Sequence, residues 1–394
     1  MVHSWFSARL ALALLVLASS PAAAVTENSY DGVVRSDVDG RFDAILPPPF
    51  ESNHASMVEV NGKGSYYMAW FSGTFEGQSD VAIVVSELAL NTTGGFEGAV
   101  WSDAPVVSER DGYSNQNPVL FHDEDTGATH LFHTQQVANE GEEHAHVWYL
   151  NCTDKSPSGP GPYGFTEPVE IFGKDGSFIK NRLLKALSGD WLFPMYYAPD
   201  PNSPDPNYSH IKSLAKGDNP ADPVWGNIDF VDTDNLVQPS VVRLVPEEPK
   251  LVAFFRDRES ISVYRAVSQD DGATWGEPEA IVGMANPNSG IEASTLASGR
   301  VAMVYNPCTS CRDPLVVSLS EDSGKTWPYT RVLEYDGGSQ EFSYPTLRQD
   351  DGSIHVSYTY KREAIKHSIV SEDWVMDPKN QYNATTAAAT ATTA

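Results

Sequence analysis

An eight-residue pattern occurs twice in this chain and restricts its possible folds more than any other feature. Ser268–Trp275 reads SQDDGATW and Ser320–Trp327 reads SEDSGKTW, so serine, aspartate, glycine, threonine and tryptophan recur in register. Each copy follows a β-like run that ends in the serine. Aspartate accepts hydrogen bonds from turn amides, glycine supplies a positive φ, and tryptophan covers the turn. The pattern predicts a tight hairpin turn within a repeated β unit.

Weaker copies of this turn lie upstream and indicate the spacing of the repeat. Ser213–Trp225, Ser86–Trp101 and a fainter match at Lys155–Phe165 keep parts of the pattern. Ser268 and Ser320 are 52 positions apart, close to the roughly 40–50 residues of one propeller blade. Between the turns, short runs rich in Val, Ile, Tyr and Phe show no sustained helical periodicity. We therefore expect an all-β fold, a six-bladed β-propeller with these hairpin turns.

The two ends of the chain differ in composition from this β-rich body. A basic residue, the apolar run Leu10–Ala18 and the small residues Pro21–Ala24 follow the order of a cleavable secretory signal. The apolar run is shorter than the about 20 residues that a bilayer-spanning helix needs. We expect residues 1–24 to be a signal peptide, residues 25–377 the propeller and residues 378–394 a disordered Thr/Ala-rich tail. The protein is then secreted, without insertion into a membrane.

The chain is strongly acidic, with 53 Asp and Glu against 26 Lys and Arg and a formal net charge of −27. Nucleic acids and anionic membranes require clustered basic residues, so neither is an expected partner. A few arginines inside a pocket can still bind the carboxylate of an acidic sugar. Four N-x-S/T sequons fit a secreted glycoprotein, at Asn91, Asn151, Asn207 and Asn383.

The three cysteines are too few for a disulfide framework, so a hydrophobic core must hold the fold together. Cys308 and Cys311 form a C-x-x-C, for which we expect a local loop disulfide in an oxidising compartment. The two histidines of Glu142–His146 share one face of an expected strand, but no third metal ligand is evident. His130 and His133 lie on opposite faces of a strand. We expect no metal site and no cofactor.

Further stretches of sequence carry a family resemblance. They are His54–Ser56, Trp70–Gly73, Asp80–Ile83, Gln116–Phe121, Ile179–Asn181, Gln238–Ser240, Asn286–Glu292, Glu341–Pro345 and His355–Arg362. Together with the two turns, known as Asp-boxes or BNR repeats, they make the chain resemble the sialidase (neuraminidase) superfamily over nearly its whole mature length, and its sialidase-like branch most of all. A ligand site is then expected at one end of the propeller channel, where the innermost strands converge.

The resemblance also implies roles for single residues. Sialidases of this superfamily hold the substrate carboxylate with three arginines, attack with a tyrosine that a glutamate activates, and use an aspartate as acid/base. By their positions in the motifs, Arg256 and Arg312 resemble the second and third arginine. Tyr344 resembles the nucleophile, and Asp80 resembles the acid/base aspartate.

Two positions depart from the family's pattern. Asn53-His54-Ala55 stands where the segment of the first arginine is expected, and Gln238 stands where the glutamate is expected. A neutral glutamine cannot take the proton of a phenol, whose ordinary pKa is about 10. His54 could act as a base instead, because the ordinary pKa of histidine is about 6.5.

The expected site draws residues from most of the blades. The candidates for catalysis are Asp80, Tyr344 and His54, and the candidates for substrate binding are Arg256, Arg312, Glu292, Gln238, Asn117 and Lys361. Asp80 and Glu292 could alternatively be the paired carboxylates of a hydrolase.

Three functions fit these residues, and each has an acidic glycan as the partner. The leading one is a sialidase-like glycoside hydrolase that removes a terminal acidic sugar. A uronate-directed polysaccharide lyase fits the same pocket, because arginines would neutralise the carboxylate while a histidine or tyrosine removes the C5 proton. A non-catalytic glycan-binding propeller fits the departures at His54 and Gln238.

Overall fold

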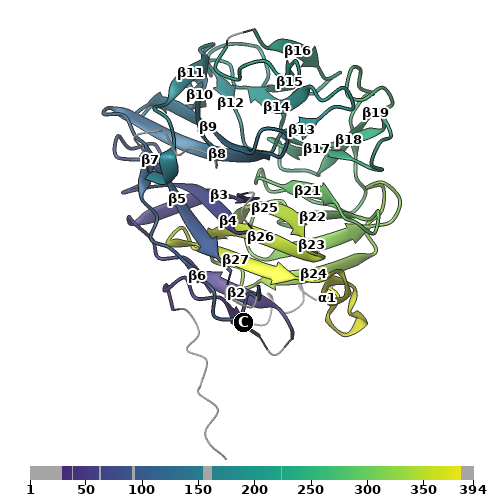
Figure 1. Ribbon diagram of the computed structural model, residues 1–394. Coiled ribbons are helices and arrows are strands. Elements are labelled where there is room, and N and C mark those ends of the chain that lie inside the picture. The colour runs from purple at the N-terminus through teal and green to yellow at the C-terminus, as the bar shows by residue number, and fades with distance from the viewer. Residues whose placement is uncertain are drawn as a thin grey trace, which may run out of the picture.

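A computed structural model describes residues 29–382 of the 394-residue chain, except 38, 62–63, 91–93, 154–161 and 223. In this part of the chain, six antiparallel sheets surround one axis and form a six-bladed β-propeller (Figure 1), which confirms the predicted fold. The expected signal peptide, the sequons at Asn91 and Asn383, and Lys155 of the faintest repeat lie outside the described residues. No helix among the described residues is long and apolar enough to cross a membrane.

The first three blades follow the chain in order. Blade 1 contains β3 (Ser52–Val60), β4 (Tyr66–Gly73), β5 (Ala82–Ala89) and β6 (Val100–Trp101), with β7 (Val106–Ser108) also paired to β5. Blade 2 contains β8 (Tyr113–Asp123), β9 (Ala128–Val137), β10 (His146–Thr153) and β11 (Val169–Phe172). Blade 3 contains β12 (Ser177–Phe178), β13 (Leu184–Lys185), β14 (Trp191–Tyr197), β15 (Tyr208–Leu214) and β16 (Gly226–Asp229).

Blades 4 and 5 are regular four-stranded meanders. Blade 4 contains β17 (Leu236–Arg243), β18 (Leu251–Asp257), β19 (Tyr264–Ser268) and β20 (Glu279–Ala280). Blade 5 contains β21 (Glu292–Thr295), β22 (Val301–Tyr305), β23 (Leu315–Ser320) and β24 (Tyr329–Glu334). The helical segments are short: η1 (Glu142–His144), η2 (Pro162–Gly164), α1 (Glu372–Met376) and η3 (Pro378–Asn380).

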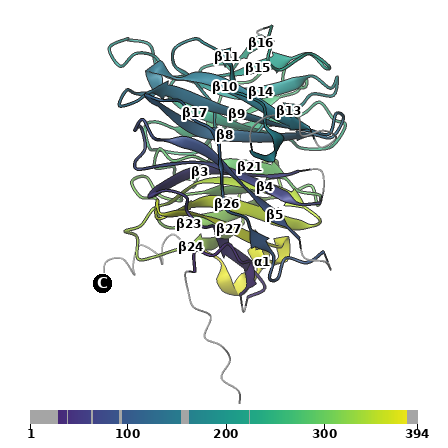
Figure 2. The same ribbon diagram turned by 60° about the vertical axis from the view of Figure 1, so that its left-hand side comes forward.

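Blade 6 is built from both ends of the described chain. It contains β25 (Phe342–Asp350), β26 (Ser353–Tyr360) and β27 (Ala364–Val370), followed outward by β2 (Phe42–Ile45) and β1 (Arg35–Ser36). β2 pairs with β27 in antiparallel register, from Phe42↔Ile369 to Ile45↔Lys366. In both views the purple N-terminal strands lie beside the yellow C-terminal ones (Figures 1 and 2). This pairing joins the two ends of the described chain within one blade and so closes the ring of sheets.

The strand directions give the propeller two distinct faces. The start of the innermost strand lies beside the end of the second strand, as in the pairs Ser52↔Gly73 and Leu236↔Asp257. The starts of the innermost strands and the loops between second and third strands therefore share one end of the channel, here called the first face. The Asp-box turns join third and fourth strands, so they lie at the opposite end, the second face.

Both complete Asp-boxes form the hairpin turns that the sequence predicts. The hydroxyl of Ser268 donates to a carboxylate oxygen of Asp270 at 2.8 Å and accepts from the amide of Gly272 at 2.8 Å. The indole of Trp275 donates to the carbonyl of Gly272 at 3.1 Å. The box at Ser320–Trp327 repeats these contacts. The boxes thus stabilise the blade ends on the second face.

Two further expectations bear on local structure. Cys308 and Cys311 form a disulfide in the β22–β23 loop, which confirms that prediction. Pro378–Asn380, assigned from sequence to the tail, forms η3, and Gln381 bridges to Arg331. Regular structure therefore continues a few residues beyond the expected boundary at 377.

Replacing Gly324 with alanine should destabilise the propeller more than the same change at Gly338. Both glycines have a positive φ, of 78° and 85°, so the backbone penalty of about 1–2 kcal/mol is common to both variants. A Cβ at Gly324 would lie 2.4 Å from ring carbon Cζ of Phe254, whereas a Cβ at Gly338 would meet nothing within 4 Å. We expect Gly324→Ala to lower the free energy of unfolding by about a further 1–3 kcal/mol in urea titrations. Equal losses in the two variants would contradict a tightly packed Asp-box turn.

Candidate active site

Four innermost strands carry the same backbone irregularity near the first face. Ala55, Asn117, Gln238 and Tyr344 have positive φ values of 54°, 46°, 51° and 49°. At each of them the strand register shifts. Such bulges re-aim a side chain out of the regular ladder, and strained non-glycine residues of this kind gather at functional sites. The repetition of one bulge in four blades therefore marks this level of the channel as a candidate site.

Tyr344 lies at the centre of the candidate site. Its hydroxyl accepts a hydrogen bond from Nη1 of Arg256 at 2.5 Å, and the ring centroid of His54 is 4.2 Å from its own. The guanidinium carbons of Arg256 and Arg312 lie 5.5 and 5.4 Å from the centroid of the tyrosine ring. The structure thus brings together four of the residues that the sequence singled out, from blades 1, 4, 5 and 6.

Gln238 is the neighbour of Tyr344 and Arg256 at the position where the family resemblance implies a glutamate. Its Oε1 accepts from Nη1 of Arg256 at 3.0 Å. Its buried Nε2 has no hydrogen-bond partner among the described residues. Arg256 is also fixed by Oδ1 of Asn288, which accepts from its Nε at 2.7 Å. Gln238 therefore orients Arg256, but it offers no carboxylate to the tyrosine.

His54 is a neutral side chain in this site. Its Nδ1 is 2.7 Å from the hydroxyl of Thr359, and its buried Nε2 has no partner within the described part of the chain. Burial, aided by the charges of Arg362, Arg312 and other cations, holds the pKa of His54 well below the ordinary value for histidine. The positive charge of this site therefore comes from the arginines, and His54 contributes a neutral ring.

A third arginine, which the sequence analysis did not select, completes the cluster. Nε of Arg362 donates to Oε1 of Glu341 at 3.0 Å, and Nη1 of Arg312 donates to the same oxygen at 2.7 Å. Burial raises the pKa of Glu341, but the two guanidinium groups outweigh it and hold that pKa below its ordinary value. The carbonyl of Arg362 accepts from the amide of Asn53 at 2.8 Å. Arg362 therefore lies beside the segment where the first arginine of the family is missing.

Lys361 was the sequence-based candidate in this turn, and the structure places it differently. Its ammonium pairs with Asp336 at 2.6 Å, whereas the neighbouring Arg362 points to Glu341 and Glu76. Both residues have a positive φ, of 57° and 62°. Which of the two side chains faces the cluster is therefore set by turn geometry, for which the motif carries no signal.

Asp80 lies on the rim of the site, in the loop between β4 and β5. Its exposed carboxylate accepts hydrogen bonds from the amide and the hydroxyl of Thr74, so it stabilises its own loop. The same loop reaches the cluster through Glu76, which accepts from Nη1 of Arg362 at 2.7 Å. Asp80 is thus carried on a loop that is joined to the cluster through Glu76.

Glu292 and Asn117 make structural contacts with other blades. Glu292 is fully buried, accepts from the amide of Leu347 at 2.7 Å and pairs with Arg182 at 3.2 Å. The amide of Asn117 donates to the carbonyl of Ile179 at 3.0 Å and so joins blades 2 and 3. The carboxylate of Glu292 is therefore engaged by Arg182 and the Leu347 amide, whereas that of Asp80 is exposed in the β4–β5 loop.

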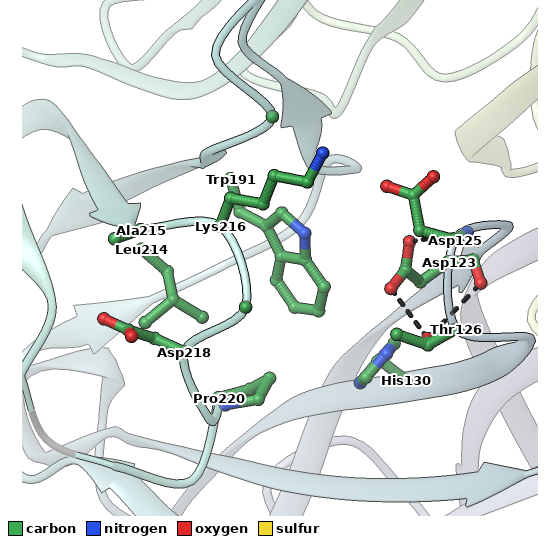
Figure 3. A pocket seen from close by; sticks show the side chains of 12 residues that line it. Asp123, Asp125, Thr126, His130, Trp191, Leu214, Ala215, Lys216, Asp218 and Pro220 are labelled. Atoms are coloured by element: carbon green, nitrogen blue, oxygen red, sulfur yellow. Dashed lines mark hydrogen bonds between the residues drawn. The ribbon is translucent and has the colours of Figure 1, made fainter.

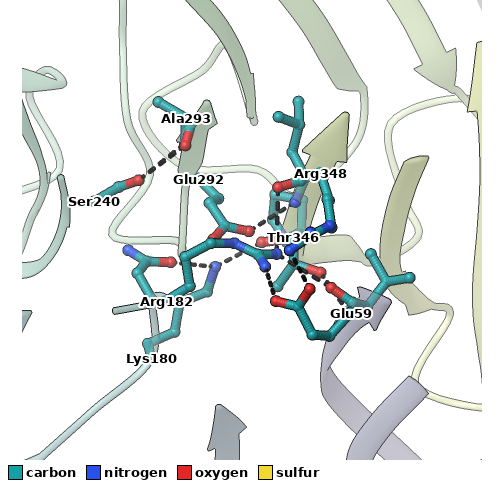
Figure 4. A network of polar contacts seen from close by, with 12 residues as sticks. Glu59, Lys180, Arg182, Ser240, Glu292, Ala293, Thr346 and Arg348 are labelled. Atoms are coloured by element: carbon teal, nitrogen blue, oxygen red, sulfur yellow. Dashed lines mark hydrogen bonds and ion pairs between the residues drawn. The ribbon is translucent and has the colours of Figure 1, made fainter. Parts of the chain in front are cut away.

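A network of buried charges fills the channel beneath the site (Figure 4). Arg182 pairs with both Glu292 and Glu59, and Arg348 pairs with Glu59. Beside them Lys180 donates to the carbonyl oxygens of Pro345 at 2.6 Å and Ile291 at 3.2 Å. Burial lowers the pKa of Lys180 to about 8. These contacts tie blades 1, 3, 5 and 6 together directly under the floor of the site.

A second polar group lies on the first face, in loops of blades 2 to 4. Glu142 accepts from the hydroxyl of Tyr196 at 2.9 Å and also pairs with Arg258. The two histidines weighed from sequence as metal ligands separate: His144 pairs with Glu140, and His146 with Glu170 and Asp175. No sequence motif predicts this group, because Glu142, Tyr196 and Arg258 come from three different blades.

The sequence of the chain matches a family model described as a BNR repeat-like domain over residues 64–356. This chain belongs to the BNR repeat family. The match covers both complete Asp-boxes and most of the bulged strands, which confirms the resemblance drawn from the motifs. No curated protein sequence matches this BNR propeller.

Solved structures similar to the BNR propeller are sialidases and related proteins of low identity. The Hadza microbial sialidase Hz136 is 15% identical with a TM-score of 0.66, over 83% of this chain and 67% of that one. The NanB sialidase of Streptococcus pneumoniae is 11% identical with a TM-score of 0.66, over 88% and 71%. A Dyadobacter fermentans protein of unknown function is 17% identical with a TM-score of 0.64, over 83% and 97%. At these identities the likeness establishes the fold alone.

Were an anionic sugar to bind at this arginine cluster, removing the guanidinium of Arg362 should weaken its binding to the BNR propeller by about 10–100-fold, since a hydrogen bond to a charged group contributes about 1.5–3 kcal/mol. Titration of Arg362→Gln with the sodium salts of a sialic acid and a uronic acid measures this loss. Lys361→Gln is the matched control, because its ammonium pairs with Asp336. Equal affinities of the two variants would contradict a role for Arg362 in binding.

Proposed function

We propose that this BNR propeller is an exported carbohydrate-active enzyme that cleaves a terminal acidic sugar from a glycan. The observation that carries the proposal is the cluster at the first face, in which the guanidinium groups of Arg256 and Arg312 flank the ring of Tyr344. Arg362 adds a third guanidinium through Glu341. One buried and two half-buried guanidinium groups gathered in an otherwise acidic protein are suited to a carboxylate.

The proposed roles follow from the contacts of each side chain. Arg256 and Arg312 bind the sugar carboxylate, and Arg256 at the same time stabilises negative charge on the oxygen of Tyr344. Asp80, on the β4–β5 loop at the first face, serves as the acid/base group. Burial of Tyr344 and His54 beside these arginines keeps the reacting atoms away from bulk water. On this basis the leading reaction is hydrolysis of a terminal acidic sugar.

Gln238 favours a second candidate reaction, elimination from a uronic acid. A hydrolase with a tyrosine nucleophile needs a base on that tyrosine, and Gln238 offers only a neutral amide. In a lyase the arginines would neutralise the uronate, so that its C5 proton becomes more acidic. His54, neutral and with a free Nε2 among the described residues, would accept this proton, while Tyr344 protonates the leaving oxygen.

Incubation of the purified protein with sialylated and uronate-terminated glycans, followed by mass spectrometry, tests the proposal. A released sugar that has gained water establishes a hydrolase, and a product lighter by one water establishes a lyase. Intact glycans throughout the panel, together with measurable binding, would replace both reactions with a glycan-binding function. N-terminal sequencing of protein from the culture medium tests export, with Val25 as the expected first residue.

A further inference from the structure

A second pocket lies on the second face of the propeller, between blades 2 and 3. It has a volume of ≈ 180 Å³, and its walls come from the β8–β9 hairpin, from Trp191 and from the β15–β16 connection (Figure 3). This pocket is at the opposite end of the molecule from the candidate active site. It is smaller than the roughly 300–1,000 Å³ of pockets for drug-sized ligands, so it suits a ligand of about one ring.

The pocket lies beside the incomplete Asp-box of blade 3. In the order of the box, Ala215 takes the place of Asp270 and Asp322, and Pro220 takes the place of the tryptophan. Both substituted residues line the pocket. The connection therefore lacks the carboxylate that folds the turn in blades 4 and 5, and its indole comes five positions later, from Trp225, which packs against Phe172 and Phe193.

His130 presents an unused hydrogen-bond donor at this pocket. The amide of Asn151 donates to the hydroxyl of Tyr149 at 2.8 Å, so Tyr149 has its own hydrogen left for Nδ1 of His130, also at 2.8 Å. Burial lowers the pKa of His130 to about 4, so the ring is neutral at pH 7. We assign its proton to Nε2, because Nδ1 accepts from Tyr149 in this arrangement. This buried N–H has no partner among the described residues. An oxygen atom supplied by a ligand would satisfy it.

The charges around the pocket argue against an anion. Asp123, Asp125 and Asp218 line it together with a single cation, Lys216. Lys185 pairs with Asp123 and, at 2.9 Å, with Asp125, which leaves carboxylate oxygens able to accept from hydroxyl groups. A ligand that both donates and accepts hydrogen bonds, carries no negative charge and has an apolar face for Trp191 fits these walls.

We propose that this pocket binds a neutral hexose ring. The C–H face of the sugar lies against the indole of Trp191, one of its oxygens accepts from Nε2 of His130, and its hydroxyl groups donate to Asp125 and Asp218. The pocket is independent of the proposed catalytic function, and it would let the propeller hold a neutral part of a glycan on its second face. Acidic sugars are excluded by the three carboxylates.

Ligand-observed saturation-transfer NMR on the purified protein tests the proposal. The probes are the methyl glycosides of glucose, galactose and mannose, with methyl glucuronide as the charged counterpart. We expect saturable binding of at least one neutral glycoside, weaker by at least 10-fold in Ala215→Trp, where an indole blocks the pocket from an exposed position. Ala273→Trp, at an exposed position in the intact box of blade 4, is the matched control and should bind as the unchanged protein does.

Two further variants separate this pocket from the candidate active site. Asp125→Ala should weaken binding of the neutral glycoside by about 3–10-fold through loss of one hydrogen bond, and Arg256→Met should leave it unchanged. The proposal is overturned if none of the three neutral glycosides binds, or if Ala215→Trp binds them as well as Ala273→Trp does. It is also overturned if methyl glucuronide binds the unchanged protein with equal affinity and loses that affinity in Ala215→Trp.

Discussion

Arg256→Met should lower kcat/KM for a terminal acidic sugar by about 100–1,000-fold, equivalent to about 3–4 kcal/mol. Arg256 is buried, and a single guanidinium contacts the hydroxyl of Tyr344, Oε1 of Gln238 and Oδ1 of Asn288. Methionine keeps much of the volume but leaves a substrate carboxylate without this partner in a desolvated site. Steady-state kinetics on the substrate that the glycan panel identifies measures the effect.

A buried arginine of the same blade supplies the control for this experiment. Arg265 is 7% exposed in β19, and its guanidinium pairs with Glu279 at 3.7 Å, away from Tyr344. Arg265→Met should therefore change thermal stability while kcat/KM stays within about 3-fold of the original. If both variants lost activity equally, the loss would reflect unfolding of blade 4. If Arg256→Met kept its activity, an acidic sugar could not be the substrate of this site.

Acid should destabilise the propeller strongly between pH 6.5 and pH 4. Burial lowers the pKa of His130, His133 and His210 to about 4 and that of His355 to about 3. In the unfolded chain these groups have a pKa of about 6.5, so below that pH the unfolded state binds protons that the folded state cannot. Each histidine then removes about 1.4 kcal/mol of stability per pH unit, against a typical total of about 5–15 kcal/mol.

Urea unfolding at pH 7, 6 and 5 measures this dependence. His210→Phe removes one buried histidine from β15 and should reduce the slope of unfolding free energy against pH by about 1.4 kcal/mol per unit. His144→Ala serves as the control, because it removes a histidine whose side chain is 44% exposed and keeps every buried one in place. A stability that stays constant from pH 7 to pH 5 would mean that the buried histidines take up protons in the folded state.

Local patterns predicted the parts of this structure that depend on a few neighbouring residues. The Asp-box turns at Ser268 and Ser320 follow from side chains that bond within eight positions, and their spacing sufficed for the blade count. Arg256, Arg312, His54 and Tyr344 were selected from motifs, and the structure brings them together. These residues lie near the ends of regular strands, where position in a motif translates directly into position in a blade.

The remaining parts of the site depend on contacts between distant blades. The sequence favoured Lys361 over Arg362, because nothing in the motif tells which residue of a two-residue turn faces the arginine cluster. It placed Glu292 in the pocket, although the depth of a residue in the channel depends on the register of a whole blade. Glu341 and Glu142 acquire their roles only through cations from other blades or loops.

The pairing of β2 with β27 has a consequence for how this chain reaches its native state. Residues 42–45 bond to residues 366–369, so the contact that completes the ring spans more than 320 positions. During synthesis, β2 emerges early and must wait until almost the entire chain has been made before its partner exists. Contacts of such separation carry a large entropic penalty for loop closure and form slowly. Five blades can form in order as the chain leaves the ribosome, but the sixth is completed only when the N-terminal strand β2 pairs with the C-terminal strand β27.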